Sequence, residues 1–290
     1  MNCLVIGGTQ FIGRHLVAEL LKGGHAVTVL HRQPKHGFGR RVKNIIADRN
    51  DPRAMKAALA GKSFEVVFDN VYDWKRGTTA GHVEATARAV NGPLHRYIFM
   101  SSVAAYGDGL NHHEGDALAP DDAPDLYVRN KAMSERALFR LHQRIGLPVV
   151  TLRPPFVYGP VNPIYREAFF WDRLRAGRKI IVPGDGRRLM QFVYVKDLVT
   201  AALRSMTEKN AVGHAFNIGN PQGTATNFEL AHMILRLTGS KSDVVFKPHP
   251  GPEVDLRVPS IEKASTLLGY KPTVSLEAGI AKTIPWYREH

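Results

Sequence analysis

The chain of 290 residues contains one cysteine, Cys3, so no disulfide can form within it. The absence of disulfides is typical of a reducing compartment and favours a cytoplasmic location. Apolar stretches are short, about six to eight residues, and a membrane-spanning helix needs about 20. A strand is expected at residues 2–6, which leaves no room for a signal peptide at the start of this sequence.

Acidic residues are also scarce. The chain has 26 of them and 39 lysines and arginines, so its net charge is +13. A basic surface favours a polyanionic partner, either a nucleic acid or a small phosphate-rich ligand. The cations are spread along the chain, with only short clusters such as Arg40-Arg41 and Arg187-Arg188, and no aromatic-interleaved RNA motif is present. This distribution favours the small ligand and leaves nucleic acid as the alternative.

Short runs rich in Val, Ile and Phe alternate with amphipathic stretches, a rhythm that predicts parallel strands buried on both faces and joined by helices. We therefore expect an α/β fold with a doubly wound parallel sheet, of the Rossmann type, and a smaller C-terminal substrate lobe. The expected strands are 2–6, 26–30, 43–46, 65–69, 96–101, 148–153 and 214–218, and the expected helices are 11–23, 52–60, 78–91, 127–145, 226–238 and 275–289.

The rhythm loosens after residue 159, which predicts two domains. Residues 1–160 plus 192–219 are expected to form the dinucleotide-binding domain. Residues 161–191 plus 220–290 are expected to form the substrate-binding lobe, which would close over the carboxyl edge of the sheet, where doubly wound proteins bind ligands.

A glycine turn joins the first strand to the first helix, in the sequence "GGTQFIG" (7–13). Gly7 permits the tight bend, and Gly13 lets helix and strand pack closely. Gln10 stands where a third glycine normally lets the backbone approach a diphosphate. We expect a reshaped turn whose amides still face a diphosphate at the helix N-terminus. The predicted contacts are Gly7, Thr9, Gln10, Phe11, Ile12 and Gly13.

The end of the second strand should contact the adenosine ribose, and an acidic side chain there would bind both hydroxyls and repel a 2′-phosphate. This chain has His31 and Arg32 instead, with Lys35 and His36 close behind. Cations at this position favour NADP, with NAD as the alternative. Asp48, just past the third strand, is a candidate partner for the adenine amino group.

A tyrosine and a lysine share one helix face in "DLYVRNKAMSERAL" (125–138), where Tyr127 and Lys131 are four residues apart. Ser102 ends a buried strand 25 residues before Tyr127 in "YIFMSSVAAYG" (97–107). With these motifs, the chain resembles the extended short-chain dehydrogenase/reductases, the family of nucleotide-sugar epimerases and dehydratases. The resemblance runs in order through "GGTQFIG", "SSVAAYG", "YVRNK", "LRPPFVYGP" (152–160), "FVYVKDL" (192–198), "FNIGN" (216–220) and "LLGYKPTVSLEAGI" (267–280).

The resemblance implies that Tyr127 is the catalytic acid–base, that Lys131 favours its phenolate and holds the nicotinamide ribose, and that Ser102 bonds the reacting oxygen. It also implies a homodimer formed by the helices at 78–91 and 127–142. The glycine turn is similar to that of an atypical branch that includes chloroplast stem-loop RNA-binding proteins. The further cofactor contacts implied by the family pattern are Arg49, Asn70, Val71, Tyr72 and Pro154.

Several positions depart from the family pattern. Val103 and Ala104 stand where related dehydratases carry an Asp-Glu pair, so removal of water is not expected. Phe156 replaces an asparagine that contacts substrate in many epimerases. An arginine that often precedes "FVYV" is also absent. The candidate substrate contacts are Ser102, Phe156, Arg187, Arg188 and Arg257.

The histidines and acids of "NHHEGD" (111–116) lack ligand spacing and predict a polar loop rather than a metal site. The leading hypothesis is an NAD(P)-dependent epimerase of a nucleotide sugar, acting through a transient ketone. The alternatives are an NADPH-dependent reductase or dehydrogenase of a smaller carbonyl compound, and an RNA-binding protein that retains the fold.

Overall fold

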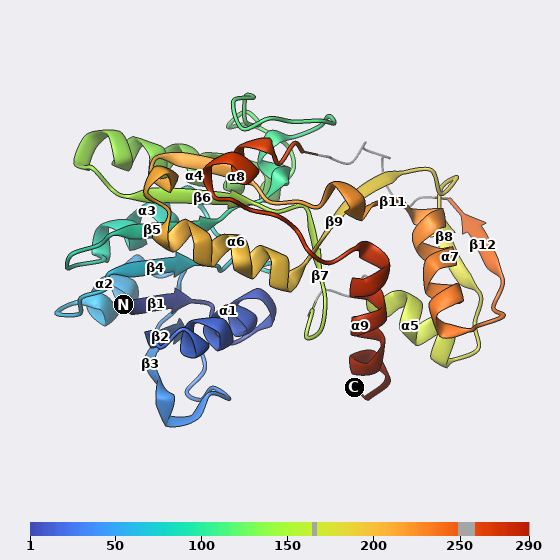
Figure 1. The fold of residues 1–290 in the computed structure, drawn as a ribbon. Coiled ribbons are helices and arrows are strands. Elements are labelled where there is room, and N and C mark those ends of the chain that lie inside the picture. The colour runs from blue at the N-terminus through green and yellow to red at the C-terminus, as the bar shows by residue number, and fades with distance from the viewer. Residues whose placement is uncertain (164–166, 249–258, 290) are drawn as a thin grey trace.

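A parallel sheet of seven strands forms the centre of the molecule, in the order β10-β6-β5-β4-β1-β2-β3 (Figure 1). The computed structural model describes residues 1–163, 167–248 and 259–289. The strands of the large sheet are β1 (Asn2–Ile6), β2 (Ala26–His31), β3 (Val42–Ile46), β4 (Val66–Asp69), β5 (Arg96–Met100), β6 (Val149–Arg153) and β10 (His214–Asn217).

Helices cover both faces of this sheet, which explains why its strands are apolar on both sides. Residues 3–6 of β1, at the middle of the sheet, are fully buried. On one face lie α1 (Phe11–Lys22) and α6 (Val195–Thr207), which pack together. On the other lie α2 (Pro52–Leu59), α3 (Ala80–Ala89) and α4 (Leu126–Ile145). This arrangement confirms the predicted doubly wound fold.

A second group of elements lies past the carboxyl ends of the strands of the large sheet, on the right in the view (Figure 1). Within it, β9 (Leu189–Tyr194) pairs with β7 (Phe156–Tyr158) and β11 (Thr224–Thr226), and β8 (Ile180–Pro183) pairs with β12 (Val244–Lys247). Its helices α5 (Glu167–Arg175), α7 (Asn227–Thr238) and α9 (Leu276–Glu289) share an aromatic-rich core. The short α8 (Glu262–Leu267) packs near β10. Single turns of 3₁₀-helix occur at Gly39–Arg41, Val103–Tyr106, Lys209–Ala211 and Pro221–Gly223.

The strand β9 belongs to the three-stranded sheet. The next elements of the chain return to the large sheet, since α6 packs on it and β10 is one of its strands. The chain thus crosses between the two groups several times, and the expected division into two domains stays a prediction. No helix among the described residues has the length and apolar character needed to cross a membrane.

Candidate active site

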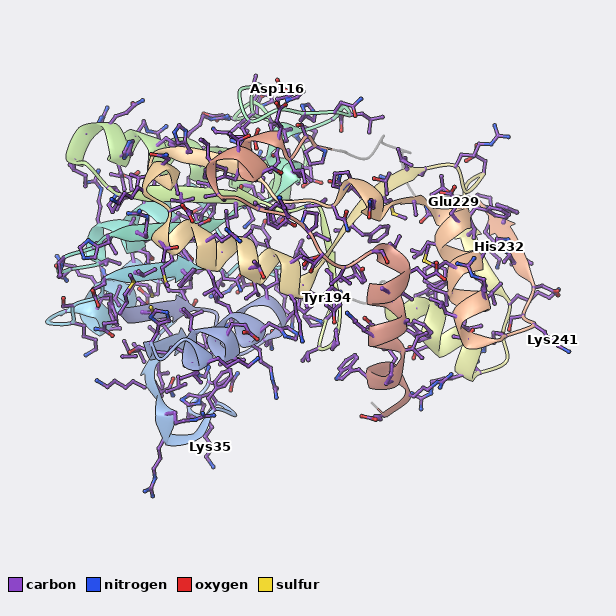
Figure 2. All side chains as sticks on the ribbon, viewed as in Figure 1. Lys35, Asp116, Tyr194, Glu229, His232 and Lys241 are labelled. Carbon is purple, nitrogen blue, oxygen red and sulfur yellow. The ribbon has the colours of Figure 1, made fainter. Side chains whose placement is uncertain are left out.

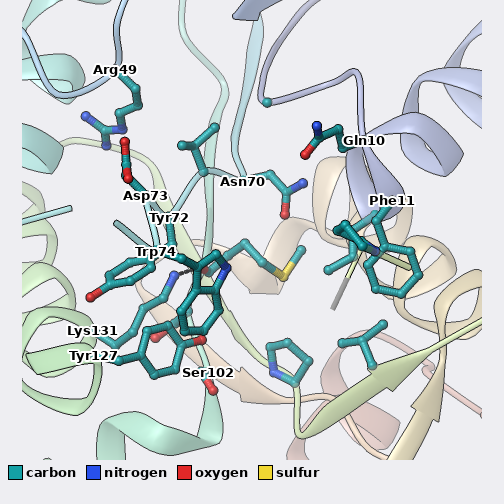
Figure 3. A pocket seen from close by; sticks show the side chains of 18 of the residues that line it. Gln10, Phe11, Arg49, Asn70, Tyr72, Asp73, Trp74, Ser102, Tyr127 and Lys131 are labelled. Carbon is teal, nitrogen blue, oxygen red and sulfur yellow. Dashed lines mark hydrogen bonds between the residues drawn. The ribbon is translucent and has the colours of Figure 1, made fainter. Parts of the chain in front are cut away.

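A cavity of about 610 Å³ opens at the carboxyl edge of the large sheet (Figure 3). Its lining follows the ends of β1 to β6 and continues onto the first turns of α4. Ligands of doubly wound proteins bind at this edge, where the strand order reverses. Of the predicted cofactor and catalytic residues, all except Gly13 line this one cavity.

The two outer glycines of the first turn are sterically required. Gly7 has φ +83°, and a β-carbon added there would collide with the side chain of Val71. A β-carbon at Gly13 would collide with the carbonyl oxygen of Gly7. Gly13 therefore acts in the packing of α1 against β1, and this explains why it does not line the cavity.

Gln10 is accommodated without a glycine because its backbone is extended, with φ −125° and ψ 152°. Its side chain is exposed on the cavity wall and forms no capping hydrogen bond to α1. The next residue, Phe11, takes the positive φ instead, at +33°. The N-terminus of α1 thus still borders the cavity, with its partial positive charge toward the place expected for a diphosphate.

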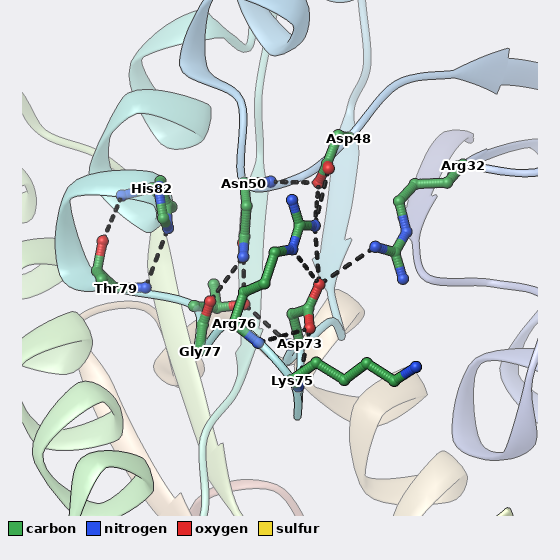
Figure 4. A network of polar contacts seen from close by, with 10 residues as sticks. Arg32, Asp48, Asn50, Asp73, Lys75, Arg76, Gly77, Thr79 and His82 are labelled. Atoms are coloured by element: carbon green, nitrogen blue, oxygen red, sulfur yellow. Dashed lines mark hydrogen bonds and ion pairs between the residues drawn. The ribbon is translucent and has the colours of Figure 1, made fainter.

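The far end of the cavity carries a network of charged side chains (Figure 4). Arg32 donates to Asp73, and Arg76 bridges Asp73 and Asp48. Burial lowers the pKa of His31, so this ring is neutral at pH 7. Of the two predicted contacts His31 and Arg32, Arg32 therefore carries the positive charge at this end, and Arg76 adds a second one. Lys35 is exposed on the loop after β2 and does not line the cavity (Figure 2).

Arg49 also lines the cavity, but its guanidinium is held by the protein itself. It pairs with the fully buried Asp69 and also donates to the carbonyl of His82 and the hydroxyl of Thr86. These bonds tie the end of β3 to β4 and α3. Arg49 therefore stabilises the structure at this place. Its contact with the cofactor stays a prediction.

Tyr127 and Lys131 are placed by α4, which begins one residue before Tyr127. The Asp125 side chain caps this helix by accepting from the backbone N–H groups of Tyr127 and Val128. Lys131 is buried, and its Nζ donates to the carbonyl of Met100 at 2.6 Å. The aromatic rings around Nζ belong to Tyr72, Phe99 and Tyr127, with centroids 5.5, 5.0 and 5.7 Å away.

Burial lowers the pKa of Lys131 to about 8, although the carboxylates of Asp69 and Glu135 partly oppose the shift. The ammonium form therefore still predominates at neutral pH. A positive charge close to the ring of Tyr127 favours the phenolate over the phenol.

Ser102 lies opposite these residues at the end of β5. Its Oγ accepts from the backbone N–H of Ala104 at 3.1 Å, and its side chain borders the cavity. Val103 and Ala104 also line the cavity and present only apolar groups. Asn70, Val71 and Pro154 complete the wall on the strand-end side.

Trp74 forms an aromatic cluster with Tyr72 and Tyr127 at the cavity mouth, which the sequence reasoning missed (Figure 3). The indole stacks on the Tyr127 ring with centroids 4.8 Å apart, and Tyr72 meets the Tyr127 ring edge-on at 4.7 Å. Trp74 remains 65% exposed. Nothing in the "VYDWK" stretch shows that a loop tryptophan reaches a tyrosine more than fifty residues away.

A buried ion pair behind the site was also missed. Glu135, on the face of α4 that carries Lys131, is fully buried and accepts from Arg153, Thr151 and Ser101. These bonds join α4 to the ends of β5 and β6. The signal was present, since Tyr127, Lys131 and Glu135 recur at intervals of four residues.

Of the predicted substrate contacts, Ser102 and Phe156 are brought together in the cavity and the arginines are not. Phe156 lines the cavity and packs near Phe192. Arg187 is exposed beside Asp185, and neither Arg187 nor Arg188 lines the cavity. Arg257 lies outside the described residues.

The loop at 111–116 uses its polar groups internally. His112 stacks on Tyr106 at 4.4 Å and bonds Asp116, while Glu114 accepts from the backbone N–H of Asn217. No group of three or more possible metal ligands occurs among the described residues.

The model of the NAD dependent epimerase/dehydratase family matches residues 3–219. The chain belongs to this family. It is thus an NAD(P)-dependent enzyme of the short-chain dehydrogenase/reductase type, as the sequence motifs predicted.

Curated relatives carry several functions. A chloroplast stem-loop binding protein of 41 kDa from Arabidopsis thaliana is 32% identical, covering 96% of this chain and 76% of the relative. A UDP-N-acetyl-α-D-glucosaminuronate decarboxylase from Bacillus cytotoxicus is 29% identical, covering 99% and 98%. Among solved structures, the UDP-glucose 4-epimerase of Thermotoga maritima with UDP-glucose is 26% identical, with a TM-score of 0.84, covering 100% and 99%.

Proposed function

We propose that the protein is an NAD(P)-dependent epimerase of a nucleotide sugar. The observation that carries this proposal is the meeting of Ser102, Tyr127 and Lys131 in one cavity with the glycine turn at its other wall. The cavity fits a dinucleotide, because the turn keeps the tight bend at Gly7 and the close helix packing at Gly13.

A bound nicotinamide would supply reversible hydride acceptance. Tyr127 removes the proton from a substrate hydroxyl as its carbon is oxidised, and returns it when the opposite face is reduced. The ammonium of Lys131 favours the phenolate that this step needs. Ser102 donates a hydrogen bond to the same oxygen and stabilises the charge that develops there.

The walls near Ser102 argue against dehydration. Removal of water needs an acid and a base beside the reacting carbon, and Val103 and Ala104 offer neither. Phe156 likewise offers the substrate a ring and no hydrogen bond. An epimerase needs only the transfer and return of one hydride, which the groups present can support.

The cofactor preference that we propose is NADP over NAD. Arg32 is 60% exposed at the end of β2 and keeps donors beyond the one bonded to Asp73. A guanidinium at this place binds a 2′-phosphate in related folds. The same end of the cavity also carries Asp48 and Asp73. Carboxylates there repel a 2′-phosphate, so NAD is the alternative.

The test is turnover of a panel of nucleotide sugars with added NADP or NAD. Tyr127→Phe removes only the phenolic oxygen, and we expect a loss of at least about a thousandfold in turnover. Tyr287→Phe, in α9 outside the cavity, is the matched control and should keep wild-type turnover. Undiminished turnover in Tyr127→Phe would remove the assigned role.

A net reductase or dehydrogenase of a smaller carbonyl compound is the second candidate, favoured by the apolar wall at Phe156 and by the distance of Arg187 and Arg188 from the cavity. This enzyme would consume NADPH stoichiometrically. An epimerase returns the hydride and leaves the cofactor unchanged.

RNA binding is a third candidate, favoured by the net charge of +13 and by the relative described as a stem-loop binding protein. It predicts an RNA affinity that falls steeply with salt. Absence of dinucleotide binding together with such an affinity would favour this candidate over the epimerase.

A further inference from the structure

The end of β2 lacks the acidic side chain that usually faces the adenosine ribose, but neighbouring strands supply carboxylates to the same place. Asp48 follows β3, and Asp73 lies in the loop after β4 (Figure 4). Both line the cavity together with Arg32. The charge at the ribose end is therefore set by three strand ends, and β2 alone does not determine it.

Asp73 is fixed by bonds from two directions. Its Oδ1 accepts from the backbone N–H groups of Lys75 and Arg76, both at 3.0 Å. Its Oδ2 accepts from Arg32 Nη1 at 3.2 Å and from Arg76 Nε at 2.9 Å. One oxygen thus shapes the loop, and the other holds the arginines.

The carboxylates balance the arginines at this end of the cavity. Partial burial raises the pKa of Asp73, but the hydrogen bonds from Arg76 outweigh it and lower that pKa to about 2. Asp73 is therefore ionised at every pH at which the protein would be assayed. The carboxylate that pairs with Arg32 is that of Asp73, so Asp73 mainly offsets the charge of Arg32. Arg76 pairs with both Asp48 and Asp73.

We propose that Asp73 sets the preference of this site at the ribose 2′ position by pairing with Arg32, in place of the missing acid on β2. The inference rests on the proposed dinucleotide function. Arg32 attracts a 2′-phosphate, and the fixed negative charge of Asp73 opposes it. The pair together keeps the preference for NADP small and lets the site accept a 2′-hydroxyl as well.

Asp73→Asn separates the two tasks of this side chain. The amide oxygen can still accept from the N–H groups of Lys75 and Arg76, so the loop is kept. The amide nitrogen replaces the oxygen that accepts from Arg32, so the charge and the ion pair are lost. Asp121→Asn is the matched control, because Asp121 pairs with Arg136 on an exposed surface outside the cavity.

The experiment measures dissociation constants of the full chain for NADP and NAD by calorimetry at one ionic strength. Adenosine 2′,5′-bisphosphate and 5′-AMP serve as probes of the adenosine end alone. We expect Asp73→Asn to raise the ratio of NADP to NAD affinity by about tenfold, and to raise the ratio for the two probes in the same direction. Asp121→Asn should leave both ratios unchanged.

Arg32→Ala changes an exposed side chain and provides a second measurement that does not depend on folding of the Asp73 variant. It should weaken NADP binding about tenfold while NAD binding changes little. An unchanged ratio in Asp73→Asn, or an NADP affinity that Arg32→Ala leaves unchanged, would overturn the inference while the dinucleotide function stands. A wild-type chain that binds neither dinucleotide would overturn both.

Discussion

Lys131 illustrates how one residue can serve catalysis at the expense of stability. Its ammonium is useful only because it is buried beside Tyr127, and the same burial lowers its pKa from the ordinary 10.5 to about 8. Below that folded-state pKa the protein holds a buried charge that the unfolded chain would expose to water. Sites arranged for chemistry often carry such a cost.

We expect Lys131→Met to abolish turnover and yet to raise the free energy of unfolding at pH 7 by up to about 3 kcal/mol. The folded chain binds fewer protons than the unfolded chain between pH 8 and 10.5. Wild-type stability therefore falls as the pH drops from 10.5 to 8, and the full cost of the buried charge is present below 8. Denaturant titrations at pH 7 and pH 10 measure both effects, with the exposed Lys62→Met as control. A change in the free energy of unfolding that is equal at pH 7 and pH 10 in Lys131→Met would contradict the assigned charge.

Trp74 is the residue whose role the sequence hides most completely. It leaves most of its surface in water, so its removal should cost little stability, but it covers the ring of Tyr127. We expect Trp74→Ala to lower kcat/KM roughly tenfold with a change in unfolding free energy below about 0.5 kcal/mol. Trp74→Phe should recover most of the activity, because a ring can still stack there.

The comparison variant for Trp74 is Phe246→Ala, another exposed aromatic change, on β12 away from the cavity. Steady-state kinetics and thermal melts compare the activity and stability of Trp74→Ala, Trp74→Phe and Phe246→Ala. If Trp74→Ala and Phe246→Ala were equally active, the tryptophan would have no part in the site.

At the scale of elements, the junction of β1 and α1 carries most of the dinucleotide half of the site. The first helix can lie close to the strand only because position 13 has no side chain. We expect Gly13→Ala to abolish detectable NADP and NAD binding, because the added methyl group must push α1 away from Gly7.

Gly81→Ala is the matched control for Gly13→Ala, because the nearest atom to a β-carbon there is 3.7 Å away. Calorimetry with each dinucleotide and thermal melts would compare the two variants. Wild-type affinity in Gly13→Ala would show that the turn does not hold the diphosphate.

The elements of the large sheet could be predicted because their signals are local. Apolar runs set the strands, and Asp51, Thr79 and Asp125 stand as side-chain caps at the starts of α2, α3 and α4. The ends of the predicted strands differ from the structure by one residue at most. The connections after β7 carry weaker patterns, and their pairing into two small sheets could not be read from the sequence.

The site shows the same contrast between local and distant signals. Tyr127 and Lys131 share a helix face, so their meeting follows from a spacing of four residues. The pairing of Arg32 with Asp73, the stacking of Trp74 on Tyr127 and the neutral state of His31 depend on loops that meet only after folding. The cations after β2 therefore predict more positive charge than the folded site presents.

At the scale of the whole molecule, the large sheet provides one edge on which both halves of the reaction can meet. The cavity there receives side chains from the first 163 residues, and none of the described residues of the small sheets beyond β7 lines it. A homodimer through α3 and α4 stays a prediction, which sedimentation of the purified chain would test. The cytoplasmic location also stays a prediction.

The most direct test follows the redox state of a bound nicotinamide in a single turnover. The protein loaded with NADP or NAD is mixed rapidly with each nucleotide sugar, and the absorbance of reduced nicotinamide is recorded. The account predicts a transient rise with at least one sugar in the wild-type chain and no rise in Tyr127→Phe. An equal rise in both proteins, or no rise with any sugar in a chain that binds dinucleotide, would contradict it.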